Sequence, residues 1–508
     1  MASSFFTSEY SRLCERSGVG EPPSAYPESA RMPVRERLVR CFWFDQNFRT
    51  EDLRVDDGRK LRVLSPGWWN LEAGPDFRNA VIRFANEPII KGDIELHVEA
   101  SGWKAHGHHC DPAYNGVILH VVLRNDTGEQ TVTTADGCAV PQFTLEPYLA
   151  GNLADLVEEL NPEDYPEVSG SSVGPCNEAI RSKAADGRWL GTFFDLAGDQ
   201  RALARMRRWE HLANSIGPET AVQCGVMEAL GFKKNKSQFA LLARLIPPQK
   251  FAAIMRNSLL NEKRQQAEAA LFGLSGLLDG TISGQPDDEA AAYIDDLRSR
   301  WAKLQNLFPD AGMEASQWVF SGSRPVNFPT RRIAAAAAFL AQNAEHGLHN
   351  ALLSCVPAEG GRVLQRDVRA ARRSFEELFT GGSGGFWETR CTFGGRKMAR
   401  PVSLVGKDRA ALILVNVVIP ALLLHARRNK QPQLEQLLHA IYVKVPRLAP
   451  TSVETSMIQR LFGGDQQAAK TISNARRQQG LYQVYKDYCE KDQRGCRRCP
   501  LLAALERK

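Results

Sequence analysis

The stretch that decides the fold is GDIELHVEASGWKAHGHHCDPAYNGVILHVVLRN, residues 92–125. Its two ends, 94–98 and 117–123, are short apolar runs, and the residues between them are rich in glycine, histidine and aspartate. This pattern is typical of β-strands joined by a polar loop. Five of the chain's ten histidines lie between His97 and His120. Since imidazoles are common metal ligands and proton carriers, the stretch indicates a candidate site on a sheet.

Further β-type runs occur on both sides of this stretch, at 61–64, 80–84 and 131–133. Before them, apolar residues spaced by three and four predict a helix over 34–48. Beyond residue 174 helical spacing dominates, and glycine and proline separate the helices. We therefore predict an α+β protein with an N-terminal β-rich domain and a larger all-helical region. The expected divisions are a loose leader (1–31), the β-rich domain (32–150), a linker (151–174), a helical domain (175–380) and a helical region with a basic, cysteine-containing end (381–508).

The composition is that of a globular protein: 43% of the 508 residues are hydrophobic. The longest apolar run, 410–425, contains Asn416 and Pro420 and is shorter than the roughly 20 apolar residues that span a bilayer, so we expect no membrane segment. The N-terminus lacks the basic start and apolar run of a secretory signal, which makes the cytoplasm the expected location. In that compartment the eleven cysteines are expected to be buried thiols or metal ligands.

Glu95 and His97 lie two residues apart on a predicted strand, so their side chains share one face. Asp76 precedes the strand before it. This layout resembles the PD-(D/E)XK phosphodiesterases, in which two carboxylates hold Mg²⁺ or Mn²⁺ and the last residue helps to activate water. The resemblance implies that Asp76 and Glu95 bind the metal. His97 replaces the usual lysine, and only about twenty residues stand where that superfamily has a helix.

His106, His108 and Asp111 form a second constellation, on the loop that follows Trp103. Two imidazoles and a carboxylate at this spacing can bind Zn²⁺ or a redox metal. The alternative is a histidine-rich turn whose rings cap backbone groups. His120 lies in an apolar run and is expected to be a core histidine, unless it faces Glu95 and His97.

The third constellation is Cys489, Cys496 and Cys499, spaced C-x6-C-x2-C. It resembles the cysteine loop of the iron–sulfur DNA glycosylases, in which a fourth cysteine follows after five residues; here that position is Leu505. A zinc or iron–sulfur site would therefore need a distant ligand such as Cys176 or Cys391.

Positive charge is concentrated near the C-terminus, where residues 470–508 hold ten Lys or Arg and four Asp or Glu. Residues 386–409 form a smaller basic region. Either region could contact nucleic-acid phosphates, and the alternative is a solvated basic surface without a partner. The candidate nucleic-acid contacts are Arg396, Lys397, Arg400, Arg494, Arg497 and Arg498.

The chain resembles an uncharacterised bacterial family catalogued as domain of unknown function 2851. The resemblance rests on the segments 73–80, 92–97, 103–108, 114–122, 174–176, 272–274 and 324–329, on Asn416 and on the terminal cysteines. It covers nearly everything from about residue 32. It implies that the family's motif positions include Asp76, Glu95, His97, His106, His108, Asp111, His120, Cys176 and the three terminal cysteines. It supplies no activity.

Three functions follow from these patterns. The first is a metal-dependent phosphodiesterase, nuclease-like, that uses Asp76, Glu95 and His97 on nucleic acid. The second is a non-catalytic scaffold that binds nucleic acid or protein. The third is a zinc hydrolase that uses His106, His108 and His120. The sequence leaves the substrate, the metal and the oligomeric state open.

Overall fold

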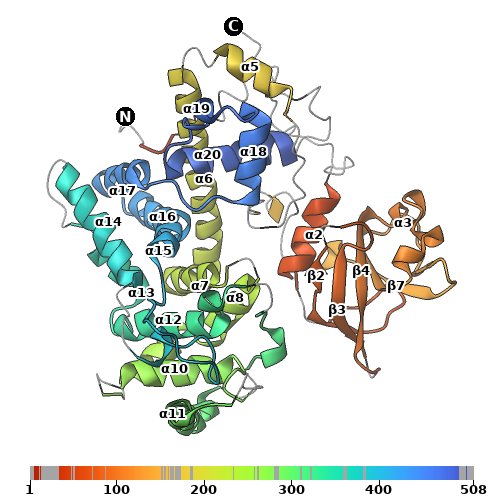
Figure 1. Cartoon of the computed structure of the whole chain (residues 1–508), viewed down its shortest axis with the longest axis horizontal. Coiled ribbons are helices and arrows are strands. Elements are labelled where there is room, and N and C mark those ends of the chain that lie inside the picture. The colour runs from red at the N-terminus through yellow and green to blue at the C-terminus, as the bar shows by residue number, and fades with distance from the viewer. Residues whose placement is uncertain are drawn as a thin grey trace. The chain divides into compact units, whose positions relative to one another are not determined.

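Figure 1 shows the computed structural model of the chain. It describes residues 5–7, 9–10, 12, 34–46, 48–49, 52–70, 72–85, 87–149, 153, 156–157, 160, 165, 173–183, 187–232, 234–256, 258–259, 262–279, 285–308, 312–320, 323–357, 363–380, 385–490, 499 and 501. The chain forms two compact units, each built from separate segments. Unit 1 comprises residues 1–8, 194–449 and 472–480, and unit 2 comprises residues 9–193, 450–471 and 481–508. The sequence-based divisions at residues 150, 174 and 380 stay predictions.

Unit 2 contains a mixed sheet of seven strands, which confirms the predicted α+β class. The strands are β1 (Leu61–Ser65), β2 (Trp68–Trp69), β3 (Phe77–Phe84), β4 (Ile90–Glu99), β5 (Val117–Arg124), β6 (Thr131–Thr133) and β7 (Ala139–Thr144). Their order is β1-β3-β4-β5-β7-β6, and β2 pairs with β3. β1, β3 and β4 form an antiparallel meander, whereas β5 runs parallel to both β4 and β7.

One face of this sheet is covered by helix α2 (Glu36–Asp45), beside β4 in Figure 1. Leu38, Phe42 and Trp43 of α2 join a core with the alternate strand residues Ile94, Leu96, Leu119, Val121 and Phe143. Because side chains alternate across a strand, the residues between these, including Glu95, His97, His120 and Gln142, project from the opposite face. The sheet therefore separates an apolar core from a polar face.

A short crossover joins the parallel strands β4 and β5. It consists of α3 (Gly102–Ala105) and two 3₁₀ turns, η1 (His108–Cys110) and η2 (Pro112–Tyr114). Trp103 of α3 is completely buried and packs with Val117, Val132 and Val140 on the polar face of the sheet. The crossover thus lies over the face that carries Glu95 and His97.

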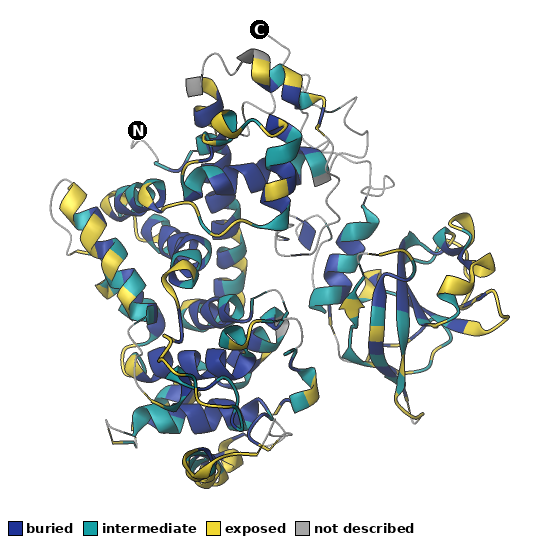
Figure 2. Cartoon of the chain, in the orientation of Figure 1, coloured by how far each residue is buried: buried dark blue, intermediate teal, exposed yellow. Residues whose placement is uncertain are grey.

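The remaining described helices of unit 2 are α5 (Cys176–Lys183), α18 (Ser452–Phe462) and α19 (Gln466–Ala469). The π-helical turn η10 (Tyr485–Glu490) follows α20 (Ala475–Val484), which begins in unit 1. α5 packs against α18, and the Asn177 side chain donates to the carbonyl of Leu461 at 2.7 Å. Figure 2 shows that α20 is mostly buried, whereas α18 has buried and half-buried residues and one exposed residue, Thr455.

Unit 1 is all-helical and is built around the packed pairs α7–α8, α10–α12 and α16–α17. Its helices are most of α6 (Gly187–Ile216), α7 (Pro218–Leu230), α8 (Lys236–Leu245), α9 (Pro248–Arg256), α10 (Lys263–Leu274), α11 (Asp288–Leu304), α12 (Pro329–Gln342), α13 (Leu348–Ser354), α14 (Gln365–Thr380), α15 (Lys407–Ile413), α16 (Ile419–Arg428) and α17 (Pro432–Lys444).

The apolar run around residue 416 is a continuous helix and is longer than the sequence analysis expected. α15, the π-helical turn η9 (Leu414–Val418) and α16 together extend from Lys407 to Arg428, which is long and apolar enough to cross a membrane by length and composition alone. Pro420 lacks an N–H, so the carbonyl of Asn416 has no donor four residues later. The helix does not end there but widens into a π-helical turn. Within its most apolar window, 72% is buried inside the structure, as in a core helix.

Candidate metal site

The strand register brings together three of the candidate side chains. His120 of β5 pairs with Glu95 of β4, and Val122 pairs with His97. Glu95, His97 and His120 therefore lie next to one another on the polar face of the sheet, and all three are at least 97% buried. His120, which the sequence analysis expected in the core unless it faced Glu95 and His97, faces them.

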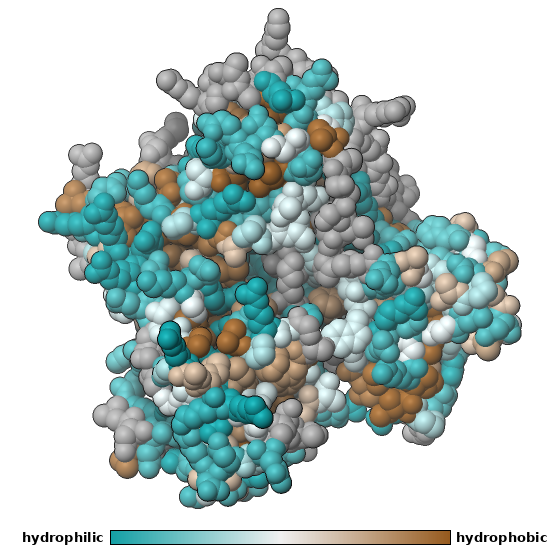
Figure 3. Space-filling model, viewed as in Figure 1, coloured by the Kyte–Doolittle hydropathy of each residue, from teal (hydrophilic) through white to brown (hydrophobic). Residues whose placement is uncertain are grey.

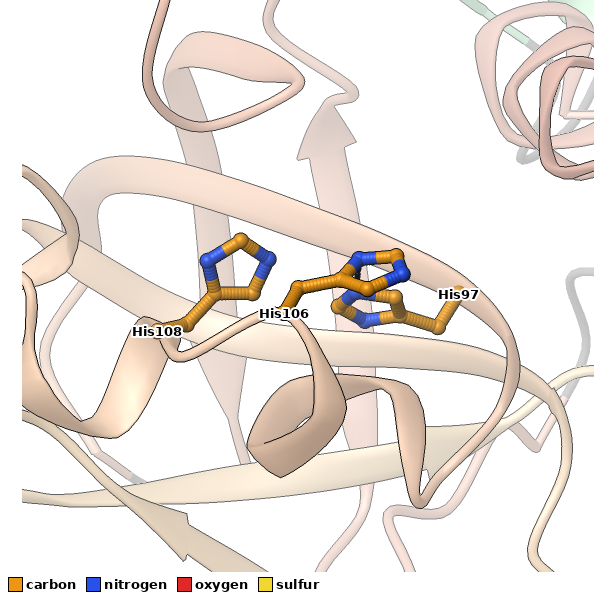
Figure 4. Close-up of side chains that lie close together, drawn as sticks. All are labelled: His97, His106 and His108. Carbon is orange, nitrogen blue, oxygen red and sulfur yellow. Dashed lines mark hydrogen bonds between the residues drawn. The ribbon is translucent and has the colours of Figure 1, made fainter.

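The crossover brings His106 and His108 to the same place, and Figure 4 shows their rings converging with that of His97. His97 Nε2 lies 3.0 Å from His106 Nδ1, and the ligand atoms of the three imidazoles lie within 4.8 Å of one another. This approach requires a glycine at position 102. A Cβ there would stand 2.5 Å from His97 Cδ2 and 2.7 Å from His97 Cγ, closer than carbon atoms pack.

Glu95 adds a carboxylate oxygen to this cluster. Its Oε1 lies 3.1 Å from His108 Nε2 and 3.9 Å from His97 Nε2. Its Oε2 accepts a hydrogen bond from the backbone N–H of Asp76 at 3.0 Å, which fixes the rotation of the carboxylate. His108 Nε2 is buried and makes no aligned hydrogen bond, although its ring stacks on Tyr114. The partner of His108 Nε2 in this structure is therefore the Glu95 carboxylate, and an imidazole nitrogen and a carboxylate oxygen this close could share a metal ion.

A relay of hydrogen bonds behind the cluster begins at Gln142 of β7. Its Nε2 donates to Asp56 Oδ2 at 2.9 Å and to the carbonyl of Glu129 at 3.0 Å, so the amide nitrogen is identified by its acceptors. Its Oε1 therefore faces His120 Nδ1, at 3.1 Å. Because a carbonyl oxygen only accepts, His120 carries its proton on Nδ1.

This tautomer determines the next one in the relay. His120 Nε2 keeps its lone pair and accepts from His97 Nδ1, at 2.9 Å. His97 therefore carries its proton on Nδ1, which leaves the lone pair of Nε2 directed at His106 and the cluster. Orienting a ligand imidazole through its second nitrogen is the usual role of the outer partners of a metal site.

Asp76 lies beside the cluster, and its oxygens are already engaged. Oδ1 pairs with Arg40 of α2 at 2.7 Å, and Oδ2 accepts from the N–H of Leu96 at 3.1 Å. Asp76 therefore positions Glu95 and Arg40, and its contacts differ from those of the metal ligand that the sequence predicted. The same Arg40 nitrogen also pairs with Glu36 at 2.5 Å, and the Arg40 side chain is 28% exposed.

Burial shifts the pKa values of these groups in the direction that favours their uncharged forms. Burial and the nearby charge of Glu95 raise the pKa of Asp76 to about 8, although the positive charge of Arg40 acts in the opposite direction. Burial also raises the pKa of Glu95 to about 8, opposed by the Asp76 N–H. Burial lowers the pKa of His97 to about 2 and that of His120 to about 3, so both rings are neutral at physiological pH. A bound cation would offset the charge that these carboxylates acquire on ionisation.

The donor set fits a first-row transition ion better than Mg²⁺. Three imidazole nitrogens and one carboxylate oxygen are ligands typical of zinc, manganese or iron, whereas Mg²⁺ prefers oxygen. His106 is exposed, so the cluster is open to solvent on that side.

Asp111 lies apart from these ligands. Its exposed carboxylate caps η2 by accepting from the N–H of Ala113 at 2.9 Å. His109, its near neighbour in the sequence, is also exposed.

The terminal cysteines are described in part: Cys489 and Cys499 are placed, and Cys496 lies outside the described residues, as do Arg494, Arg497 and Arg498. Cys391 lies in unit 1, with its sulfur 3.8 Å from that of Met398.

Acidic partners engage part of the basic regions. Lys397 pairs with Glu289 at 2.9 Å, and Arg390 pairs with Asp287 and Glu289. Nearer the C-terminus, Arg476 and Arg477 pair with Asp199 and Asp195 of α6. Arg396 and Arg400 are exposed, and hydrophilic residues cover much of the face in Figure 3.

Four residues that shape the site were missing from the sequence analysis: Arg40, Asp56, Gly102 and Gln142. Only Gly102 left a signal, since a glycine beside a buried tryptophan in a loop indicates close packing. The other three act across distances in sequence that only strand register and helix packing reveal.

A family model described as "Protein of unknown function (DUF2851)" matches residues 36–447, and the terminal cysteines lie beyond the match. Neither the curated proteins nor the solved structures contain a match.

Proposed function

This chain belongs to the DUF2851 family, and we propose that it is a metal-dependent hydrolase of phosphodiesters whose metal is zinc or manganese. The observation that carries the proposal is the convergence of His97, His106 and His108 within 4.8 Å, with Glu95 Oε1 beside them. Three protein nitrogens with access to solvent are typical of hydrolytic metal sites, which keep a position open for water or substrate.

The order of elements supports a phosphodiester as the substrate class. Asp76 precedes β3, Glu95 and His97 follow on β4, and a helical crossover leads to the parallel strand β5. This is the order expected from the resemblance to PD-(D/E)XK phosphodiesterases, and α3 with the turns η1 and η2 occupies the place of the expected helix. Nucleic acid is the polymer of this class to test first.

Each residue then has a distinct task. His97, His106, His108 and Glu95 hold the ion, which when bound would supply a Lewis acid and lower the pKa of water. His120 and Gln142 hold His97 in the tautomer that can bind it. Asp76 orients Glu95 through its backbone N–H, and the guanidinium of Arg40 provides positive charge for a phosphate.

Metal analysis and cleavage assays on purified full-length protein test the proposal. We expect one zinc or manganese ion per chain, lost in Glu95→Gln and His108→Ala and kept in His109→Ala, an exposed histidine of the same turn. Cleavage of labelled DNA, RNA or bis(p-nitrophenyl) phosphate with Zn²⁺ or Mn²⁺ should follow the metal content across these variants.

Two results would contradict different parts of the proposal. If the zinc or manganese content is unchanged in Glu95→Gln and His108→Ala, the metal site is contradicted. If the protein binds a stoichiometric ion but cleaves no phosphodiester, the proposed substrate class is contradicted and the scaffold alternative is favoured.

A further inference from the structure

Cys176 and Cys489 are far apart in the sequence and meet on helix α18. Cys176 opens α5, and the preceding Gly174 donates its N–H to the carbonyl of Arg460 at 2.9 Å. A Cβ built on Gly174 would lie 2.7 Å from Arg460 Cγ and 3.1 Å from Cys176 Sγ. The Cys176 thiol is therefore next to the Arg460 side chain.

Cys489 reaches the same part of α18 from the other end of the chain. Its sulfur lies 3.8 Å from that of Met457, which is three residues before Arg460 and so on the same face of the helix. Its thiol also interacts with the Arg460 side chain. The Arg460 side chain is therefore close to both thiols.

Cys499 belongs to the same group. The pKa of the Cys489 thiol is raised to about 12 by burial, and the charges that Cys499 and Cys176 would carry as thiolates add to the shift. Two positions later, the side chain of Leu501 is 97% buried, which anchors the backbone that carries Cys499. Three thiols from two remote segments therefore share one partly buried region with a single arginine.

We propose that Cys176, Cys489 and Cys499 supply three of the thiolate ligands of an iron–sulfur cluster that links α5 and the C-terminal segment over α18. Thiolates are the ligands of such clusters, and the positive charge of Arg460 complements the negative charge that a thiolate-ligated cluster carries. The site is separate from the histidine cluster and does not depend on the proposed hydrolase activity.

Thiolates also bind zinc, and the two kinds of site differ in how far apart their sulfurs stand. Zinc–sulfur bonds of about 2.3 Å keep the sulfurs around one ion within about 4.6 Å of each other. In a cluster, thiolates bind different iron atoms and stand farther apart.

Full-length protein isolated without oxygen tests the assignment. We expect iron and acid-labile sulfide in the unmodified protein, with the visible absorption of a brown chromophore. Cys176→Ser, Cys489→Ser and Cys499→Ser should each lose most of the iron and sulfide. Cys138→Ser, which replaces an exposed cysteine beside β7, and Glu95→Gln should keep them.

The sulfide content of the unmodified protein is a readout that does not depend on how the variants fold. Protein isolated without iron and acid-labile sulfide would overturn the cluster, whatever its zinc content. Iron and sulfide retained in Cys176→Ser would overturn the link between α5 and the C-terminal segment.

Discussion

The relay from Gln142 through His120 to His97 gives the sharpest test of the site. In Gln142→Leu the amide is lost, and the Nδ1–H of His120 has no acceptor at 3.1 Å. His120 is then free to carry its proton on Nε2 and to donate it to His97 Nδ1. His97 would then carry its own proton on Nε2, and its lone pair, on Nδ1, would point away from the cluster. The substitution changes no ligand, so any effect on metal binding acts through orientation.

The magnitude follows from the role of outer partners in metal sites. Their removal typically weakens metal binding by about 10- to 100-fold, or about 1.4 to 2.7 kcal/mol. Asp56 keeps its bonds from Asn125 and Thr144, so the orphaned group is the single N–H of His120. Leaving it unpaired should lower the free energy of unfolding of the metal-free protein by about 1 to 3 kcal/mol.

The assay is a competition titration of Zn²⁺ against a chelator, with urea unfolding of the metal-free protein in parallel. The matched control is Gln130→Leu, because Gln130 has the same side chain on the exposed surface next to the same strands. Nitrogen-detected NMR of the metal-free protein gives a direct view of the His97 tautomer, with the proton expected on Nδ1. A folded Gln142→Leu protein that binds Zn²⁺ as tightly as the unmodified chain, or a His97 protonated on Nε2, would refute the relay.

Two further predictions concern packing and charge. Gly102→Ala should displace the His97 ring, which lowers the metal content, and should lower the free energy of unfolding by about 1 to 3 kcal/mol. The control is Gly312→Ala, because no atom lies within 4 Å of its added carbon and its φ is not positive. A normal metal content in Gly102→Ala would show that the ring tolerates the contact. The metal-free protein should lose stability as the pH rises from about 6.5 to about 8. In the folded chain Asp76 and Glu95 keep their protons up to a pH of about 8, whereas in the unfolded chain they ionise near pH 3.8 and 4.5, so their contribution to stability falls as the pH rises toward 8. His97 and His120 are neutral in the folded chain, and their contribution to stability rises with pH only up to about 6.5, where the histidines of the unfolded chain lose their protons. Thermal melts across this window should show the fall, with a shallower slope in Glu95→Gln and after Zn²⁺ is added, and a melting temperature that rises with pH would contradict the assignment.

The local part of the site could be predicted from the sequence. Alternation along β4 placed Glu95 and His97 on one face, because side-chain direction in a strand depends only on parity. The loop histidines were recognised from their spacing alone. Both inferences needed nothing beyond neighbouring residues.

What the sequence could not supply was pairing between distant segments. Whether His120 faces His97 depends on the register of two parallel strands, which no single strand encodes. The engagement of Asp76 by Arg40 depends on how α2 crosses the sheet. Between Cys176 and Cys391 the sequence offered no choice, because a ligand far away in sequence leaves no spacing pattern.

Unit 2 is built from segments that the ribosome makes at different times. The sheet with its histidine cluster is complete once residues 34–149 have emerged, whereas α18 and Cys489 follow only after most of unit 1 has been synthesised. The histidine cluster can therefore form on the nascent chain, and the cysteine group can form only near the end of translation. The two groups of side chains are therefore completed in a fixed order, because the chain passes through unit 1 between the segments of unit 2.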